Sequence, residues 1–476
     1  MLKRILSALF STRLMAVLFI VFAIAMAAGT FIENDYNTDT ARLWVYNTWW
    51  FEGIMLVFVI NFAGNIKRYN LLSREKWSTL LLHISFILII IGAFVTRYIS
   101  YEGMMPIREG ATESTFFSEG MFLTAMVDGE YQGGMKRRNF EKKLLLSPVS
   151  DNDFELSGEF ADKPFTIRNK RYIMGAVDTV IPKANGKTFL KMVEAGEGGR
   201  HNHYLEAGQL ENIHNLLFAV NKFTPGAINI NTTGKTVTIQ MPFEGNFMRM
   251  ADKFQGTVTK DSVQPMMFRS LYSVGEARFV FPDQPVIGEH TFTSDGKMKE
   301  KQSEDALILE VESQGKQQEI TVTGSRGRVG APVAIKLNNL DFTIGFGSKS
   351  YQLPFTIRLN DFIASKYPGT QKSYSAYESR ITLTDGKDNF DSRIYMNHVL
   401  DHRGYRFFQA SFDPDEKGTI LSVNHDFWGT WITYIGYFML FTGLVAILFT
   451  KGSRFGDLKR KLEAVRRKKS KLAMLV

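Results

Sequence analysis

Four long runs of apolar residues, three near the start of the chain and one near its end, constrain the fold more than any other feature. They cover about 14–32, 49–66, 77–96 and 425–450. A helix needs ~20 mostly apolar residues to cross the hydrocarbon core of a bilayer. No comparable run lies between Thr96 and Asn424. The sequence therefore predicts a membrane protein with four transmembrane α-helices and one large domain, 97–424, outside the bilayer.

Two of the runs leave room for another interpretation. The second is the shortest and contains polar residues, including Glu52 and Asn61. The first lies in a segment, Met1–Gly29, that resembles a secretory signal, with Ala25-Met26-Ala27 as a candidate cleavage site. A retained helix is favoured because the apolar character continues through Ile32, beyond that site.

The distribution of charge predicts the orientation. The N-terminal segment, the loop after the second run and the tail 451–476 together hold 17 basic and 3 acidic residues. Their net charge is +14, whereas the whole chain carries +9, so the remainder sums to −5. Cytoplasmic loops carry such a basic excess. We therefore expect an inner-membrane protein with cytoplasmic termini and a periplasmic large domain. Topology and anionic lipid explain the basic pI without nucleic-acid binding.

The chain contains no cysteine. Thiolate catalysis and thiolate metal binding are excluded. A domain facing an oxidising compartment without disulfides must be stabilised by burial of its core.

Residues 97–424 resemble a β-rich, sandwich-like domain. Turn residues such as Gln314-Gly315 separate short runs of strand-forming residues, and this pair predicts a hairpin. The predicted strands include Thr236–Met241, Ala277–Phe281, Leu307–Val311, Glu319–Val322 and Phe342–Phe346. One stretch differs, since its apolar residues recur at helical spacing before Thr224-Pro225-Gly226. We expect an amphipathic helix there, with its apolar face formed by Leu210, Ile213, Leu216, Leu217 and Val220.

His83 is the most informative single residue, because it lies inside the third apolar run. An ionisable side chain at that depth is costly and needs a partner. It lies six residues after Trp77, roughly 9 Å along the helix axis, in the half nearer the cytoplasm. Imidazole is a good axial ligand of haem iron. The alternative is a structural hydrogen bond, for example with Thr79 one turn earlier, and physics alone leaves both roles open.

Two arginines follow the third helix closely. Arg97 and Arg108 are suited to bind anionic haem propionates. They are equally suited to anchor the helix end at the membrane interface, which is the commoner role.

The remaining histidines carry weaker signals. His201 and His203 form a His-x-His pair in a polar loop, a pattern that is more often solvated than metal-binding. His214 falls between apolar positions of the expected helix and is interpreted as structural. Three others lie near the end of the large domain, where nothing in the sequence fixes their geometry: His398, His402 and His425. No phosphate loop, nucleophile elbow or zinc motif is present.

Three stretches are similar to the ResB/CcsB family of system II cytochrome c maturation. They are LLLHISFILIIIGAFVTRYISYEGMMPIREG (Leu80–Gly110), LPFTIRLNDFIASKYPGT (Leu353–Thr370) and IYMNHVLDHRGYRFFQASFDPDEKGTILSVNHD (Ile394–Asp426). The layout of three helices, a large domain and one helix also matches. The middle of the chain, about 120–340, is similar in its general character more than in its exact sequence.

The resemblance implies a function. Proteins of this family pair with a CcsA/ResC-type subunit, and together they move haem across the membrane and attach it to a Cys-x-x-Cys-His apocytochrome c. It implies that His83 is an axial ligand of the iron of a b-type haem bound non-covalently in transit. The tryptophan-rich segment of the partner is not reproduced by Trp49-Trp50 or Trp428–Trp431. The chain is therefore expected to belong to a haem lyase complex without being catalytic alone.

Two alternatives stay open at this point. The basic and then apolar end, Lys471–Val476, is consistent with an ordinary terminus or with the N-terminal half of a fused CcsBA-type protein, which is slightly favoured. The rival function is a non-enzymatic, membrane-anchored envelope scaffold whose periplasmic domain binds other proteins.

Overall fold

A computed structural model describes residues 2–196, 199–297, 304–370, 373–450 and 454–473. The chain divides into two compact units. Unit 1 comprises Met1–Tyr172 with Leu307–Val476, and unit 2 comprises Ile173–Ala306.

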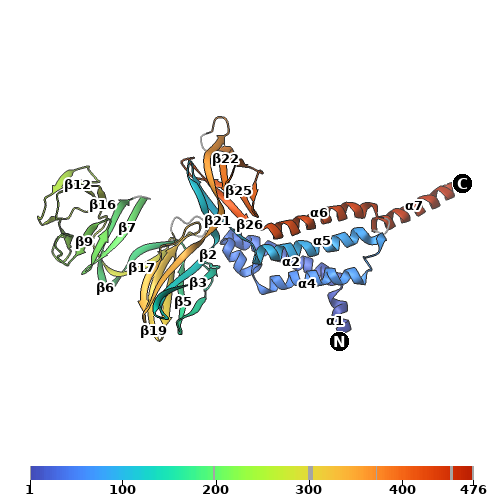
Figure 1. The fold of residues 1–476 in the computed structure, drawn as a ribbon, viewed down its shortest axis with the longest axis horizontal. Coiled ribbons are helices and arrows are strands. Elements are labelled where there is room, and N and C mark those ends of the chain that lie inside the picture. The colour runs from blue at the N-terminus through green and yellow to red at the C-terminus, as the bar shows by residue number, and fades with distance from the viewer. Residues whose placement is uncertain (1, 197–198, 298–303, 371–372, 451–453, 474–476) are drawn as a thin grey trace. The chain divides into compact units, whose positions relative to one another are not determined.

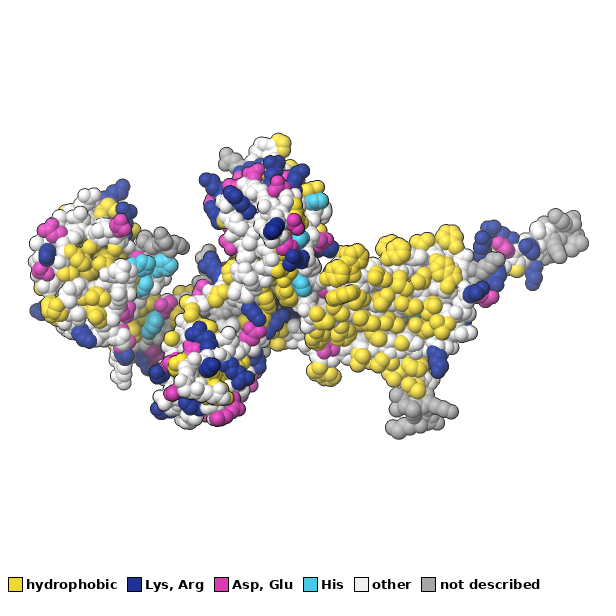
Figure 2. All heavy atoms as spheres, in the orientation of Figure 1, with side chains coloured by type: hydrophobic (Ala, Val, Ile, Leu, Met, Phe, Trp, Pro, Cys, Tyr) yellow, Lys and Arg dark blue, Asp and Glu magenta, His cyan; other side chains and the backbone are white. Residues whose placement is uncertain are grey.

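Among the described residues, four helices of unit 1 are long and apolar enough to cross a membrane. They lie side by side and carry a continuous apolar surface (Figures 1 and 2). They are α2 (Thr12–Asp35), α4 (Trp49–Arg68), α5 (Trp77–Tyr98) and α6 (Phe427–Phe449). Shorter helices accompany them: α1 (Leu2–Leu9), α3 (Thr38–Ala41), η1 (Arg42–Tyr46), η2 (Arg74–Lys76) and, after α6, the longer α7 (Arg454–Ala473). The predicted class, four membrane helices with a large β-rich domain, is confirmed.

A seam of small residues joins α5 to α6. A Cβ atom added at Gly436 would lie 3.2 Å from the Ser85 carbonyl oxygen, and one at Gly443 would lie 3.3 Å from the Ser78 carbonyl oxygen. The two backbones thus approach closely, as small residues allow in membrane helices. The seam consists of buried residues that repeat every seven positions on each helix: Ser78, Ser85 and Gly92 on α5, and Gly429, Gly436 and Gly443 on α6.

The polar residues of the second apolar run hold α4 against the start of the chain. Asn61 donates its side-chain amide to the carbonyl oxygens of Leu9 (2.5 Å) and Ser11 (3.1 Å), and Asn65 donates to Asn61 Oδ1 (2.7 Å). Leu9 ends α1, and carbonyls at the C-terminal end of a helix lack intrahelical partners, so the Asn61 amide satisfies a group that hydrocarbon would leave unbonded. This explains why asparagines occur within an apolar run.

Two strands of unit 1 are directly connected to membrane helices. Strand β1 (Tyr101–Arg108) follows α5 directly. Strand β26 (Gly418–His425) runs directly into α6 (Figure 1). These two strands pair antiparallel from Tyr101↔His425 to Arg108↔Gly418. At the junction, Thr96 Oγ1 donates to Asp426 Oδ2 (2.5 Å), while Asp426 Oδ1 caps α6 by accepting from the Gly429 N–H (3.0 Å). The packed helices α5 and α6 and the paired strands β1 and β26 therefore form one continuous structural unit.

Ten strands form the sheet that contains this strand pair. Their order is β23 (Asp388–Tyr395), β22 (Tyr374–Asp385), β21 (Leu340–Lys366), β2 (Thr112–Tyr131), β1 (Tyr101–Arg108), β26 (Gly418–His425), β25 (Tyr405–Phe412) and β24 (Leu400–His402), with β20 (Val333–Leu337) beside β21 and β3 (Gly134–Leu144) beside β2. Near the membrane the sheet curls around a core that includes Met105, Ile357 and Phe407.

A second sheet packs on the other half of β2 and β21. Its order is β19 (Lys316–Gly324), β18 (Asp305–Ser313), β5 (Lys163–Ile173) and β4 (Glu155–Phe160). The two layers enclose a core that includes Leu123, Leu309 and Phe342, so this part is a sandwich. The turn Gln314-Gly315, with both residues at positive φ, joins β18 to β19 as the hairpin prediction requires.

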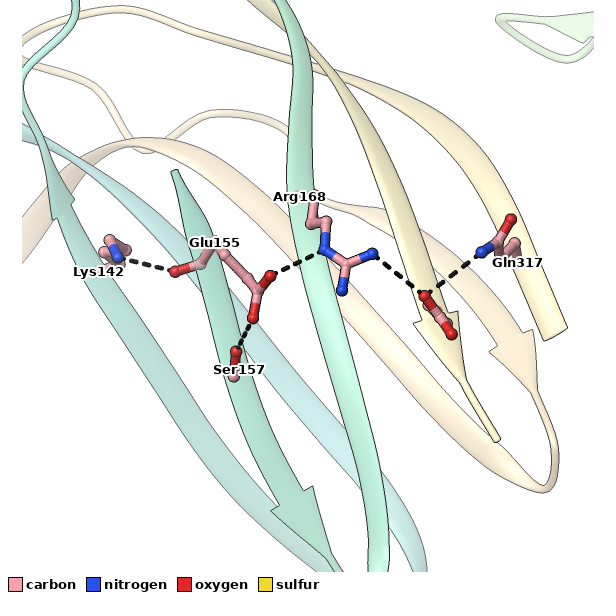
Figure 3. Close-up of polar contacts among 6 residues, drawn as sticks. Lys142, Glu155, Ser157, Arg168 and Gln317 are labelled. Atoms are coloured by element: carbon pink, nitrogen blue, oxygen red, sulfur yellow. Dashed lines mark hydrogen bonds and ion pairs between the residues drawn. The ribbon is translucent and has the colours of Figure 1, made fainter. Parts of the chain in front are cut away.

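Polar contacts run from β3 of the first sheet across the exposed face of this second sheet (Figure 3). Lys142 on β3 donates to the Glu155 carbonyl oxygen (2.7 Å), and Arg168 binds the Glu155 carboxylate (2.8 Å). Arg168 also contacts Glu312 (3.4 Å), which accepts from Gln317 (3.3 Å). Exposed pairs of this kind contribute little to stability individually, so we assign them to the surface of the sandwich.

The loop between α2 and α4 is fastened to the sandwich. The buried hydroxyls of Thr40 and Ser147 lie 2.8 Å apart, and Asp39 forms an ion pair with Arg326. These contacts hold the outer end of the helix bundle to the β domain within unit 1.

Unit 2 contains two further sheets. One has the order β13 (Gln255–Val258), β12 (Gly245–Arg249), β15 (Ser270–Val274), β16 (Ala277–Val280), β6 (Ala176–Gly196) and β17 (Val286–Ser294), with β7 (Gly199–Glu206) beside β6. The other has the order β14 (Gln264–Pro265), β11 (Thr238–Gln240), β10 (Ile228–Asn231), β9 (Leu216–Val220) and β8 (Leu210–Ile213). Their shared core includes Leu190, Phe218 and Tyr272.

The amphipathic helix expected from Leu210 to Val220 is wrong. This stretch is the hairpin β8–β9, whose strands pair from Leu210↔Ala219 to Ile213↔Leu216. His214 and Asn215 form its two-residue turn with φ of 47° and 66°, the left-handed conformation that such turns use. Two short strands separated by two residues place apolar side chains at spacings that imitate a helix.

Candidate functional site

Helix α5 places His83 on the side of the bundle that faces α4. The imidazole meets the Phe62 ring edge-on, with centroids 5.6 Å apart. Phe62 is stacked in turn on Phe86, one helical turn further along α5 (5.0 Å, 5° between the planes). The ring of His83 is half-buried. The histidine therefore lies beside an aromatic surface within the membrane-spanning bundle.

One nitrogen of His83 is occupied by the backbone. Nδ1 lies 2.9 Å from the carbonyl oxygen of Thr79. A carbonyl oxygen only accepts hydrogen bonds, so Nδ1 must carry the proton. In the neutral imidazole this leaves a lone pair on Nε2, the arrangement that orients histidine ligands of metals. No hydrogen bond to Nε2 occurs within the part of the chain that the structure describes.

The contact with Thr79 is the structural hydrogen bond that the sequence suggested as the alternative role. It uses only Nδ1, however, so it does not compete with coordination through Nε2. A backbone contact that fixes the ring and the tautomer is compatible with both roles.

Arg97 lies at the opposite end of α5, ~21 Å from His83 along the helix axis. Its guanidinium binds the Glu52 carboxylate on α4 (2.6 Å) and donates to the Tyr46 carbonyl oxygen (2.9 Å). Tyr98 donates to the same carboxylate (2.6 Å). This network, which joins α5, α4 and η1, fits the role of an interfacial anchor.

Arg108 lies at the far end of β1, beyond the membrane helices. It binds Asp415 through both terminal nitrogens (2.9 and 2.5 Å) and Asp413 through one (2.6 Å). The guanidinium hydrogen bond is the main reason why the pKa of Asp415 is lowered to about 2. Asp413 and Asp415 thus both bind Arg108.

The structure does not bring His83, Arg97 and Arg108 together. Both arginines already have carboxylate partners, which haem propionates would have to displace. The propionate role of the arginines therefore stays a prediction, and His83 carries the candidate site alone.

A cleft that sequence reasoning missed lies within unit 1, where its β domain meets α6. Its volume is about 440 Å³, and the hairpin β24–β25 and the first two turns of α6 form its walls. Arg406 binds Asp401 with two hydrogen bonds (2.6 and 2.8 Å) and contacts the Tyr434 hydroxyl (3.3 Å). The signal was present in the sequence, since aromatic residues follow a polar segment at the membrane boundary. The residues that meet there include His402, Arg403, Phe427 and Trp431.

The three histidines at the end of the large domain lie in different surroundings. His402 contributes to the cleft and binds Asp385 (2.8 Å). The ring of His425 stacks on Tyr101, with centroids 4.8 Å apart, beside the start of α6. The exposed ring of His398 stacks on Tyr395. Of the three, His425 lies nearest in sequence to a membrane helix.

The histidines of unit 2 contact carboxylates. His203 Nε2 and His214 Nε2 lie 3.3 and 3.1 Å from different oxygens of buried Glu194, while His201 is exposed. His290 forms an ion pair with Asp178. Within the described ranges, no group of three or more His, Asp or Glu residues is arranged to hold a metal ion. The His201–His203 pair therefore gains no support as a metal site.

The ion pair of His290 predicts a pH-dependent stability. The Asp178 side chain raises the pKa of His290 above its ordinary value, against the smaller opposing effect of desolvation. The stabilisation is therefore complete below pH ~6.5 and is lost as pH rises through the elevated pKa. We expect amides of β17 to exchange up to ~fivefold more slowly in the wild type than in His290→Gln at pH 6, because a partly exposed pair is worth at most ~1 kcal/mol.

Hydrogen exchange with mass spectrometry on the full chain measures this effect. The wild-type and variant rates should converge once the pH has risen beyond the elevated pKa of His290, where the imidazole is neutral in both folded and unfolded states. A difference between them that is independent of pH would show that His290 acts by packing alone.

Comparison with known proteins connects this architecture to a family. Residues 321–423 match the model of the ResB-like family. Over 464 residues, or 97% of this chain, the sequence is 27% identical to Protein NrfI of Wolinella succinogenes. The aligned part is 36% of NrfI, so the chain spans about a third of that relative's length. The predicted resemblance is thereby confirmed.

Proposed function

From its similarity to the ResB-like family, we propose that the chain is the ResB/CcsB-type subunit of a system II cytochrome c synthase. In this role it takes part in carrying haem across the membrane and presenting it for attachment to apocytochrome c. Its membrane helices and β-rich domain supply the framework, and His83 supplies one axial ligand.

The free Nε2 of His83 is the observation that carries this proposal. The Thr79 carbonyl fixes the tautomer in which Nε2 has the lone pair that iron requires. The Phe62–Phe86 stack next to the imidazole offers an apolar, aromatic surface suited to a porphyrin. The substrate would be a b-type haem, held non-covalently while in transit.

A partner subunit completes the proposed site. One histidine fills a single axial position of the iron, and the described membrane helices contain no other histidine. We assign the second ligand to a CcsA/ResC-type subunit, supplied as a separate chain or within the same polypeptide. The cysteine thiols come from the apocytochrome, since this chain has none.

The proposed location is the bacterial inner membrane, with the β-rich units in the periplasm and the basic segments in the cytoplasm. The basic loop around η2 and the basic helix α7 support this orientation, because positively charged segments stay on the cytoplasmic side. Haem would then meet His83 in the half of the bilayer that is nearer its site of synthesis.

Spectroscopy of the purified membrane complex tests the proposal. The chain co-expressed with a CcsA/ResC-type subunit should show a Soret band and should transfer haem covalently to a Cys-x-x-Cys-His apocytochrome. The chain alone should not transfer haem. If the complex lacks haem and covalent attachment proceeds normally without this chain, the rival function, an envelope scaffold, is the better description.

A further inference from the structure

Helix α7 carries a narrow apolar stripe. Phe455, Leu458, Leu462 and Val465 are separated by three, four and three residues, so they fall within an arc of about 80° at 100° per residue. Each side chain is more than half exposed (53, 56, 53 and 52%). An apolar stripe of this kind on a helix needs a surface to cover it.

The rest of α7 is strongly basic. The helix contains nine lysines and arginines against Asp457 and Glu463, a net charge of +7. Lys459 and Arg466 border the stripe on one side and Lys461 on the other, by the same angular spacing. Such side chains extend along apolar surface while their charged ends reach an anion. The helix therefore combines an apolar stripe with cationic flanks.

Among the residues that the structure describes, none covers the apolar stripe. From Asp457 to Ser470 every residue of α7 is exposed, so no described segment packs on the stripe. An isolated helix of this length with so many like charges is only marginally stable in water. Its start at Arg454 follows the end of the membrane helix α6 at Phe449 by five positions, which keeps α7 close to the bilayer surface.

We propose that α7 is an interfacial helix that binds anionic phospholipid. The apolar stripe enters the boundary between headgroups and acyl chains, and the basic flanks bind the headgroup phosphates. This function is separate from haem handling and does not depend on it.

The absence of cysteine makes the test direct, because a single introduced thiol can be labelled in the full chain. A nitroxide at Leu462→Cys reports from the stripe, and one at Ala464→Cys reports from the far side of the helix as the matched control. The labelled chain is placed in nanodiscs of phosphatidylcholine with or without phosphatidylglycerol. Collisions with oxygen, which concentrates in lipid, are compared with collisions with a water-soluble nickel complex.

With phosphatidylglycerol present, the ratio of oxygen to nickel collisions should be severalfold higher at 462 than at 464. High salt should reduce this difference, because it screens the headgroup charges. Equal, water-like exposure at both positions would overturn the proposal. So would spin–spin broadening at 462 that disappears on dilution with unlabelled protein, because it would show that a second copy of α7 covers the stripe.

Discussion

Replacing His83 with alanine is expected to remove most of the haem from the purified complex. The substitution deletes the only ligand that this chain is proposed to give to the iron, without creating an unpaired buried polar side chain. The Thr79 carbonyl loses its imidazole partner and keeps its place in the helix ladder. We expect haem retained through purification to fall at least about tenfold, equivalent to ~1.4 kcal/mol of binding free energy or more. The height of the Soret band per mole of protein is the measurement.

Added imidazole separates coordination from packing in this experiment. It should restore the band in His83→Ala, because a free imidazole can occupy the space of the deleted ring. His398→Ala is the matched control, since that ring is exposed on the β domain and should leave the spectrum unchanged. An unchanged Soret band in His83→Ala would show that other residues bind the iron. The role of His83 would then be limited to its hydrogen bond with Thr79.

Replacing Gly436 with valine is expected to destabilise the helix bundle by forcing α5 and α6 apart at their seam. Even the first added carbon would lie 2.8 Å from Ile89 Cγ1 and 3.2 Å from the Ser85 carbonyl oxygen. A backbone oxygen cannot move aside as a flexible side chain does, so the helices must separate. Overpacking of this kind costs about 1–3 kcal/mol. Unfolding in detergent mixtures, followed by tryptophan fluorescence, measures the loss.

Gly53→Val is the matched control for this prediction. Gly53 also lies in a membrane helix, α4, yet nothing is within 4 Å of a Cβ atom added there. Both variants change helix propensity and apolarity equally, so the difference between them reports the seam. Equal stabilities of the two variants would mean that α5 and α6 separate at little cost.

The membrane part of the fold could be predicted from the sequence because length and hydropathy alone decide whether a helix can span a bilayer. The β domain was predicted in class only, because its sheets join strands far apart in the chain, such as β1 with β26 and β2 with β21. The error at Leu210–Val220 had a local cause. Short strands around a two-residue turn reproduce helical spacing, and only the pairing partners in β10 reveal the difference.

Of the candidate site, only His83 could be predicted from the sequence. A histidine in an apolar run is anomalous without any structural information, whereas arginines after a helix are ordinary. The partners of Arg97 and Arg108 come from Glu52 and from Asp413 and Asp415, and no local pattern links them. The seam could have been found, since the seven-residue spacing of Gly429, Gly436 and Gly443 is visible in the sequence.

The continuous unit formed by α5–β1 and β26–α6 should resist bending. Eight consecutive cross-strand pairs begin where the helix seam ends, and Thr96 and Asp426 bridge the transition. A scissor-like opening of the two helices would have to shear these pairs or bend at the two short junctions. The four segments should thus behave as a stiff lever, so that a force applied at the curled sheet is transmitted into the bilayer instead of being absorbed at a hinge.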